Sequence, residues 1–503
     1  MWSAVIACGL GAIVLVAVCF RWSRRKVNAA MAKMNGPPTM PLIGHLHLIR
    51  FTNQVNIFNF MNHIGSTYPS PVGLRLGHIN VVVVHHPEHL QTIMTSPHCI
   101  SRPFFHDFLR VSRGLFSSPA HMWRGQRKVL SHSFGPGILS SFVPIFNEKS
   151  ATLTRLMGVH VGKGEHDFHR EMAKVALDTI YSTAFGTNFD MQVVPEGDKY
   201  LDYQEMFAHL VVKRMFSTWC YIERMYRFTK DFKREQEALA YAKTLTDRVL
   251  KARKADDILS RKIEISTPAE DMDGRKPMMF LDKVLELARD NKLQLAKDDI
   301  AQHMNTIVFA GNDTTANTMS NVLLMLAMHP DVQERVYQEV MEACPGTDQS
   351  VSMEDITKLT YTEMVCKETM RLFPVGPIIA RVAEKDIKLS DEHEIPEGCI
   401  LICGIYVAHR DPKIWGPKAS EFNPDHFLPE NVSKLHPYAY LPFSGGVRNC
   451  IAVKYAWISM KITIVHILRK YRLTTSLTMD KITLGFFGSL KIANGCCISL
   501  ENR

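Results

Sequence analysis

The segment PFSGGVRNCIAVKYA, residues 442–456, places one cysteine between a glycine-rich loop and an apolar, helix-like run. Gly446 permits a tight turn with backbone amides close to a ligand, and the start of the following helix stabilises a thiolate at Cys450. Phe443 would shield the sulfur from water, and Arg448 would pair with a carboxylate. A thiolate that ligates iron needs these surroundings, whereas most free cysteines are simply buried apolar side chains.

A second set of residues that could do chemistry lies in the run AGNDTT, residues 310–315. Ala310 and Thr314 share one helical face, and small side chains such as Ala310 and Gly311 let a flat cofactor and a diatomic ligand approach the helix. A threonine hydroxyl can bond back to the carbonyl four residues earlier. Asp313 is costly to bury unless it is paired or functional. Taken alone, adjacent threonines in a helix are usually a packing detail.

Two further pairs have helical spacing. Glu368 and Arg371 lie three residues apart among apolar residues, which favours a buried ion pair over an exposed pair of little energetic value. Trp123 and Arg127 lie four residues apart in WRGQR, a spacing that an ordinary amphipathic helix with an exposed arginine would also show. Neither pair identifies an activity by itself.

Together these segments resemble the cytochrome P-450 family of haem-thiolate monooxygenases. The family signature F-x-x-G-x-R-x-C-x-G is matched at Phe443, Gly446, Arg448 and Cys450. The chain departs from it only at the last position, where Ala452 replaces glycine. The resemblance implies a P-450 fold, mainly α with a small β part, and a noncovalent haem b with Cys450 as the axial iron ligand. The methyl group of Ala452 would press on the contact between helix and porphyrin, which predicts an adjusted haem seat and not a loss of haem.

The same resemblance assigns roles to the other segments. Thr314 would hold dioxygen and Asp313 would help to relay protons to it, as in the family motif A/G-G-x-D/E-T-T. Some mammalian members carry a glutamate that bonds covalently to haem; here that position is Ala310, which predicts noncovalent haem. Glu368 and Arg371 match the E-x-x-R pair, a structural pair behind the haem.

The resemblance also implies which side chains meet the haem propionates. Trp123, Arg127 and Arg448 would do so, and Arg381 stands where another propionate-binding arginine is often found. The family usually completes the E-x-x-R pair with an arginine in P-x-R-F; His426 stands there in NPDHF, which predicts a weaker network. The residues expected to contact the cofactor are Trp123, Arg127, Ala310, Gly311, Arg381, Phe443, Gly446, Arg448, Cys450 and Ala452.

The elements that must position these residues are mainly helical. Apolar residues at three- and four-residue spacing predict helices across 121–254, 298–328, 355–373 and 450–470. A hairpin is predicted over 72–86, short strands and turns over 377–440, and a further hairpin at the end of the chain. The polar stretch 257–277 predicts an exposed loop within one large domain.

Composition narrows the function classes. The 503 residues are 46% hydrophobic and 22% charged, as in an ordinary globular protein with a large core. Eleven cysteines without a CxxC pair favour reduced thiols in a reducing compartment. The net charge of +9 is not gathered in a nucleic-acid-binding tail, which favours a basic face for an acidic protein or a membrane surface.

The first residues predict a membrane anchor. Residues 2–20 are apolar except for Ser3, close to the ~20 residues that span a bilayer, and a basic cluster follows at 21–26. This predicts a single-pass protein of the endoplasmic reticulum membrane with its body in the cytosol. A cleaved signal peptide is the alternative, which the length of the apolar run disfavours. The predicted division is an anchor (2–20), a basic and proline-rich linker (21–45) and one catalytic domain (46–503).

The implied function is a monooxygenase that inserts one oxygen atom of O2 into a lipophilic substrate and releases the other as water. Because the chain has no Rossmann fingerprint, electrons would come from NADPH through NADPH–cytochrome P-450 reductase, with cytochrome b5 as a second candidate donor. Docking is expected near the Cys450 loop, where Lys128 and Lys454 are candidates.

The sequence is compatible with several classes of lipophilic substrate. The segments YVAHRDPKIW and EFNPDHFLPEN look most like insect members of the fourth clan, which is related to fatty-acid ω-hydroxylases. Fatty acids, hormones and xenobiotics all fit apolar contact segments. The expected contact segments are 104–116, 207–219, Phe309, the residues after Phe373, and the turn at 486–487.

Two other functions stay open. A haem-thiolate isomerase or synthase would rearrange a peroxide without a reductase, but such an enzyme does not need the intact Asp313–Thr314 pair. A non-catalytic haem protein that binds lipophilic ligands would tolerate the departures at Ala452 and His426. Turnover without NADPH would support the first, and substrate binding without NADPH consumption would support the second.

Overall fold

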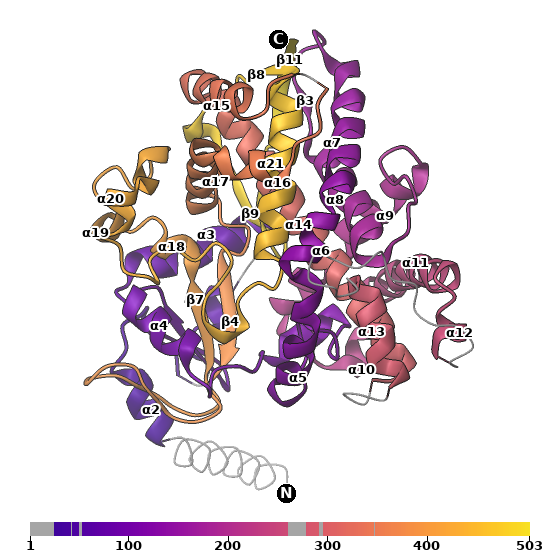
Figure 1. The fold of residues 1–503 in the computed structure, drawn as a ribbon. Coiled ribbons are helices and arrows are strands. Elements are labelled where there is room, and N and C mark those ends of the chain that lie inside the picture. The colour runs from indigo at the N-terminus through magenta and orange to yellow at the C-terminus, as the bar shows by residue number, and fades with distance from the viewer. Residues whose placement is uncertain (1–24, 42, 50–52, 260–277, 291–294, 347) are drawn as a thin grey trace, which may run out of the picture.

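The computed structural model describes residues 25–41, 43–49, 53–259, 278–290, 295–346 and 348–503. The anchor expected at 2–20 and most of the loop expected at 257–277 lie outside these residues. Across the described ranges helices dominate and strands are few and short, as predicted (Figure 1). In the same ranges no single helix has the length and apolarity to cross a membrane, whereas one bent pair, Ala120–Phe134 with Pro136–His160, does by those two criteria.

The helices run through the whole described chain. Their bounds are α2 (Arg25–Ala32), α3 (Gln54–Thr67), α4 (Pro87–Thr95), α5 (Ala120–Leu130), α6 (Pro136–Ser141), α7 (Val143–Met157), α8 (His169–Phe185), α9 (Pro195–Met215), α10 (Glu223–Tyr226), α11 (Lys230–Ala252), α12 (Ala255–Leu259), α13 (Phe280–Arg289), α14 (Lys297–Met328), α15 (Pro330–Ala343), α16 (Met353–Lys358), α17 (Thr360–Leu372), α18 (Ile405–Ala408), α19 (Pro412–Trp415), α20 (Pro429–Val432) and α21 (Val453–Leu468).

Helix α14 is the longest and packs closely along α8. Gly311, in the middle of α14, makes this contact possible, because a Cβ there would lie 2.8 Å from Cδ1 of Ile180 in α8. The missing side chain of Gly311 is therefore explained by helix packing, a reason that the local sequence did not show.

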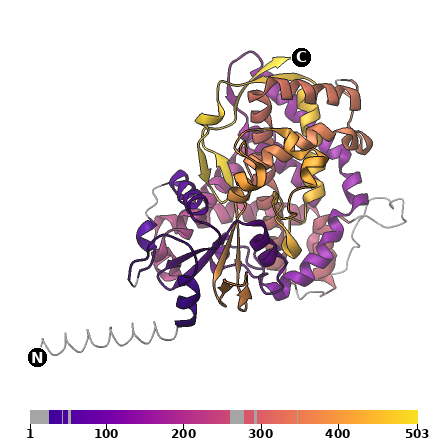
Figure 2. The same cartoon turned by 90° about the vertical axis from the view of Figure 1, so that its left-hand side faces the viewer.

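The four-stranded main sheet lies on the side of the molecule near α2, away from the C-terminus (Figures 1 and 2). The main sheet has the order β1 (Val72–Leu76), β2 (Ile79–Val84), β7 (Ile400–Gly404) and β4 (Ile378–Val382). Strands β2 and β7 are parallel and the other two pairs are antiparallel. The predicted hairpin at 72–86 is thus confirmed, with Gly77 in its turn at φ +61°.

Further strands complete the β part. They are β3 (His166–Asp167), β5 (Ile387–Lys388), β6 (Glu394–Ile395), β8 (Tyr471–Thr474), β9 (Leu484–Phe486), β10 (Leu490–Ile492) and β11 (Cys497–Asn502). Strands β9 and β10 form the hairpin predicted near the end of the chain, while β11 pairs with both β3 and β8. The last strand therefore ties the C-terminus to the start of α8.

The inner position of β2 explains its run of four valines. Val82 and Val84 pack into one core cluster with α4, and Val81 and Val83 pack into another on the opposite face of the sheet. A strand that is buried on both faces has no need of polar alternation.

The prediction of a single helix over 355–373 is wrong, because the structure has two helices, α16 and α17, separated at Leu359. Glu339 of α15 accepts hydrogen bonds from the backbone N–H groups of Tyr361 and Thr362, at 2.6 and 2.8 Å. The free N–H groups at the start of α17 are thus satisfied by a carboxylate from another helix. This contact between elements is not visible in the local pattern.

Candidate active site

A cavity of about 670 Å³ lies between α14 and the loop that precedes α21. It brings together most of the residues predicted to do chemistry. Those in its wall are Trp123, Arg127, Ala310, Gly311, Asp313, Thr314, Phe443, Arg448, Cys450 and Ala452. Gly446 and Arg381 are not part of this wall, and their roles toward a cofactor stay predictions.

Cys450 lies in the turn before α21, because that helix begins at Val453 and not at the cysteine as predicted. The Cys450 N–H donates to the carbonyl of Phe443 at 2.9 Å, and the Ala452 N–H donates to Sγ at 3.3 Å. Burial raises the pKa of the Cys450 thiol, although the Ala452 N–H and Arg127 both favour the thiolate. A metal cation at the sulfur would deprotonate it outright.

Ala452 and Gly446 fit the cysteine loop for different reasons. Ala452 has φ −102°, which any residue adopts, so the backbone accommodates the departure from the family glycine. Gly446 has φ +68°, and a Cβ there would lie 1.9 Å from the carbonyl oxygen of Met94 in α4. Glycine is therefore needed where the loop meets α4.

Arg127 braces the cysteine loop from α5. Its Nη1 donates to the backbone carbonyl of Asn449 at 3.0 Å, and its Nη2 donates to Oδ1 of the same residue at 2.9 Å. One turn earlier, the Trp123 ring lies 5.0 Å from the guanidinium carbon of Arg448, in cation–π geometry. The predicted spacing thus places both side chains beside the Cys450 loop.

Three buried guanidinium groups, those of Arg102, Arg381 and Arg448, form no ion pair within the described part of the chain. Nε of Arg102 and Nε of Arg448 are buried without a hydrogen-bond partner there. Burial and the charges of the other two arginines hold the pKa of Arg102 well below its usual value. Burial and Arg381 lower the pKa of Arg448 to about 9. A dicarboxylate would supply the missing negative charge, so these residues fit a haem with two propionates.

Arg102 is a site residue that sequence reasoning missed. It lines the cavity, whereas the side chain of Arg381 is buried behind the wall. The sequence feature that could have pointed to Arg102 is its position between two apolar residues, Ile100 and Pro103, which are both buried. Such a pattern predicts burial but does not say what the charge faces.

Asp313 and Thr314 lie side by side on the cavity face of α14. The Thr314 hydroxyl donates to the carbonyl of Ala310 at 2.6 Å, as its spacing predicted. The Asp313 carboxylate pairs with Nζ of Lys491 at 2.8 Å and accepts a hydrogen bond from Oγ of Ser489 at 2.5 Å. Sequence reasoning missed these two partners, which come from the β9–β10 hairpin.

Comparisons with known proteins agree with this geometry. Residues 34–495 match the family model described as cytochrome P450. The chain belongs to the cytochrome P450 family. It is 32% identical to "probable cytochrome P450 313a4" of Drosophila melanogaster, over 99% of this chain and 98% of that protein. Cytochrome P450 4c21 of Blattella germanica is 30% identical over 93% of each chain.

The expected likeness to insect P450 proteins is thereby confirmed. Cytochrome P450 4g1 of Drosophila melanogaster is a third relative, 30% identical over 100% of this chain and 95% of that protein. The chain is a P450 monooxygenase, and haem is the cofactor of its family.

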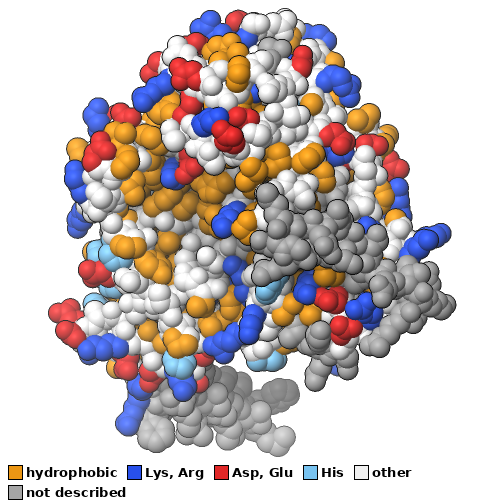
Figure 3. Space-filling model, in the orientation of Figure 1, with side chains coloured by type: hydrophobic (Ala, Val, Ile, Leu, Met, Phe, Trp, Pro, Cys, Tyr) orange, Lys and Arg blue, Asp and Glu red, His pale blue; other side chains and the backbone are white. Residues whose placement is uncertain are grey.

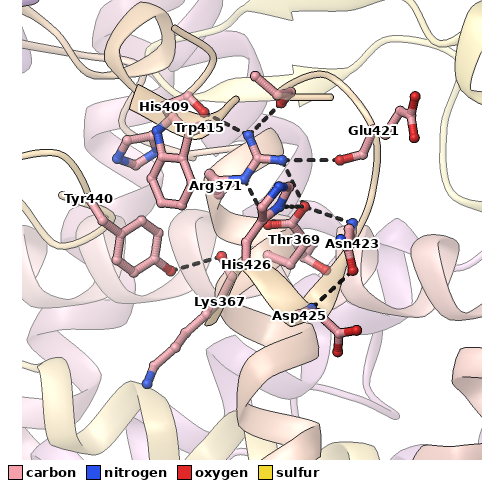
Figure 4. A network of polar contacts seen from close by, with 12 residues as sticks. Lys367, Thr369, Arg371, His409, Trp415, Glu421, Asn423, Asp425, His426 and Tyr440 are labelled. Carbon is pink, nitrogen blue, oxygen red and sulfur yellow. Dashed lines mark hydrogen bonds and ion pairs between the residues drawn. The ribbon is translucent and has the colours of Figure 1, made fainter. Parts of the chain in front are cut away.

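Behind the cavity, Glu368 and Arg371 of this P450 form a fully buried ion pair (Figure 4). Arg371 donates through Nε and Nη2 to the two carboxylate oxygens, both at 2.7 Å. Its other bonds reach backbone carbonyl groups of His409, Ala419 and Glu421. The structure therefore excludes an exposed Glu368–Arg371 ion pair, which the three-residue spacing alone also allowed.

His426 fills the third position of this network in the P450. Its Nδ1 lies 3.1 Å from Oε1 of Glu368, and the backbone N–H of Asn423 donates to the same oxygen at 2.8 Å. Burial opposes ionisation of Glu368, but the bonds from Arg371 and His426 outweigh it and lower the pKa of this carboxyl. The departure from the family arginine therefore leaves the carboxylate fully bonded.

Proposed function

We propose that this P450 is a membrane-anchored monooxygenase that hydroxylates or epoxidises lipophilic substrates with electrons delivered from NADPH by a separate reductase. The observation that carries the proposal is one cavity whose wall contains Cys450, Asp313 and Thr314 and extends to Phe207 and Phe309. Fatty acids, hormones and xenobiotics all suit such an apolar chamber.

Each polar residue of the wall has a task in this proposal. Bound haem would supply the redox and oxygen-activating chemistry. Cys450 would hold it through the sulfur that the Ala452 N–H faces, and Arg102 and Arg448 would bind its propionates. Thr314 would present its hydroxyl oxygen to the cavity, because its proton is engaged by a backbone carbonyl.

Proton delivery would run through Asp313. Lys491 and Ser489 hold this carboxylate at the rim of the cavity, next to Thr314 on the same helix. The Asn317 side chain donates to the Asp313 carbonyl at 2.7 Å and lies 3.0 Å from Nε2 of His169. Polar groups thus surround Asp313 on the side away from the substrate chamber, which suits a carboxylate that passes protons inward.

Most of the segments expected to contact the substrate contribute residues to this cavity wall. Phe104, Phe105, Phe207, Phe309 and Phe486 all line it, whereas Trp219 and Phe487 do not. This aromatic wall supports a lipophilic substrate.

The proposal includes an anchor at 2–20, a linker at 21–45 and a catalytic domain at 46–503 on the cytosolic side of the endoplasmic reticulum membrane. The reductase, or cytochrome b5, would dock beside the Cys450 loop, where Lys128 and Lys454 are exposed. On the face drawn in Figure 3, basic and acidic side chains are interspersed, which favours a small basic contact over a broad one.

The decisive test uses the full chain in membranes. The reduced carbon-monoxide difference spectrum should show the red-shifted band of thiolate-ligated haem, and Cys450→Ser should abolish it. Adding a reductase and NADPH should then yield oxygenated fatty-acid or hormone products. Turnover without NADPH would replace the proposal with the isomerase, and substrate binding without NADPH consumption would replace it with the non-catalytic carrier.

A further inference from the structure

Far from the haem cavity, two histidines and a glutamate meet where α7, β3 and α8 join. His160 ends the 3-10 turn η4 (Gly158–His160) that follows α7, His166 opens β3, and Glu171 lies in the first turn of α8. The pairing of β3 with β11 fixes this junction at the end of the molecule that carries the C-terminus (Figure 1). None of the three residues lines the cavity described above.

The two imidazole rings are held in place by aromatic packing. Their centroids lie 3.8 Å apart with an interplanar angle of 22°. Both rings meet the buried ring of Phe168 edge-on, at centroid distances of 5.4 Å for His160 and 4.8 Å for His166. This packing brings ring nitrogen atoms of the two histidines close together.

The carboxylate of Glu171 completes the group. Its Oε1 lies 3.0 Å from Nε2 of His166, while its Oε2 is buried with no hydrogen-bond partner in the described chain. A buried carboxylate oxygen without a partner is unfavourable unless a cation or donor reaches it.

We propose that His160, His166 and Glu171 bind one divalent transition-metal ion, for which Zn²⁺ is the best match. One ligand atom from each residue lies within 4.8 Å of the other two, and no other such group of three occurs in the residues that the structure describes. Two imidazoles and a carboxylate are a ligand set that Zn²⁺ accepts, with water in the fourth position. Mg²⁺ and Ca²⁺ prefer oxygen ligands and would bind poorly.

Binding requires a small local rearrangement. Zinc–ligand distances are about 2.0–2.2 Å, so the three ligand atoms must draw closer and the His160 ring must tilt out of the stack. Asp167 is not a further ligand, because its Oδ1 already accepts bonds from the N–H groups of His169 and Cys496. The bound ion would tie the end of α7 to β3 and α8.

The test uses full-length, haem-loaded protein purified with a histidine-free tag, stripped with a chelator and titrated with ZnCl2 by calorimetry. We expect one Zn²⁺ per chain, and at least about tenfold weaker binding in His160→Ala and His166→Ala. The matched control His121→Ala changes an exposed histidine of α5 and should bind as the parent does. Cys497→Ser, which removes a nearby thiol, should also leave the affinity unchanged.

Thermal unfolding provides a second readout that does not depend on catalysis. Zn²⁺ should raise the melting temperature of the parent and of His121→Ala, but not that of the two site variants. The carbon-monoxide spectrum of each variant shows whether its haem site is intact. Absence of one-to-one binding in the parent would overturn the proposal, as would unweakened binding in either site variant with an intact spectrum.

Discussion

The carboxylate of Asp313 is fixed by two groups from a single hairpin, Lys491 at 2.8 Å and Ser489 at 2.5 Å. Both are separated from Asp313 by more than a hundred residues of sequence, so no local motif announces them. A lysine at this distance restrains the direction of the carboxylate. Lys491 is thus a positioning residue for the proposed proton relay.

Replacing Lys491 by Gln should impair proton delivery while the haem site stays intact. We expect turnover to fall about tenfold, because the Asp313 carboxylate loses its orientation, and the solvent isotope effect on turnover to grow. The carbon-monoxide spectrum should stay unchanged. Lys481→Gln, an exposed lysine before the same hairpin, is the control, and equal turnover in both variants would refute the assignment.

The residue at 310 decides how haem is attached. Ala310 lines the cavity and offers no carboxyl group for an ester bond to the cofactor. Extraction with acidified organic solvent should therefore release all haem from the denatured chain, as measured by the visible absorbance of the two phases. Haem that stays with the precipitated protein would contradict this expectation.

Among the elements, a buried carboxylate of α11 contacts Arg110, the residue that follows the 3-10 turn η2 (Phe104–Leu109). Glu235 of α11 accepts bonds from Nε of Arg110 at 2.7 Å and from the Tyr226 hydroxyl at 2.8 Å. Nη1 of Arg214 lies 3.9 Å from the same carboxylate. This single group therefore ties α9, α10 and the residue after η2 to α11.

Glu235→Gln should therefore loosen the contact between these segments. Arg110 and Arg214 keep their ion pairs with Glu223, at 3.1 and 2.6 Å, but their bonds to the buried carboxylate are weakened, so we expect the free energy of unfolding to fall by about 2 kcal/mol. Denaturant unfolding measures this loss, and stopped-flow binding should show faster substrate release. Glu237→Gln, an exposed glutamate on the same helix, should show neither effect. A similar loss in both variants would assign the effect to helix charge and not to the contact.

Elements that depend on local patterns were predictable, and those that depend on distant partners were not. The spacing around Cys450 and the long apolar helix through Thr314 follow from nearby residues, so both were located from the sequence. The break at Leu359 depends on a carboxylate from another helix. Arg102 lines the cavity and Arg381 does not, and this difference depends on how two segments far apart in the sequence pack together.

For the whole molecule, buried neutral histidines predict sensitivity to acid. Burial lowers the pKa of His409 to about 3 and those of His303 and His466 to about 4. In the unfolded chain the pKa of a histidine is about 6.5. The unfolded state then binds more protons below that pH, so stability is complete above it and falls as the pH drops toward 4.

Urea unfolding of the haem-loaded protein checks this expectation. The midpoint should be clearly lower at about pH 5.5 than at about pH 7.5. His409→Gln removes one titrating group, so its midpoint should change less between the two conditions even if it starts lower. A midpoint that rises on acidification would contradict the assignment.

The three guanidinium groups of Arg102, Arg381 and Arg448, which form no ion pair in the described part of the chain, have a consequence for how the protein matures. Without a dianion these positive charges repel one another, which opposes the packing of the segment that carries Arg102, although Arg102 donates to the carbonyl of Ala380 at 3.2 Å. Cofactor capture and closure of this segment become one event in biogenesis. In cells short of haem, newly made chains should accordingly be cut by proteases first between residues 100 and 116, while the long central helix stays intact.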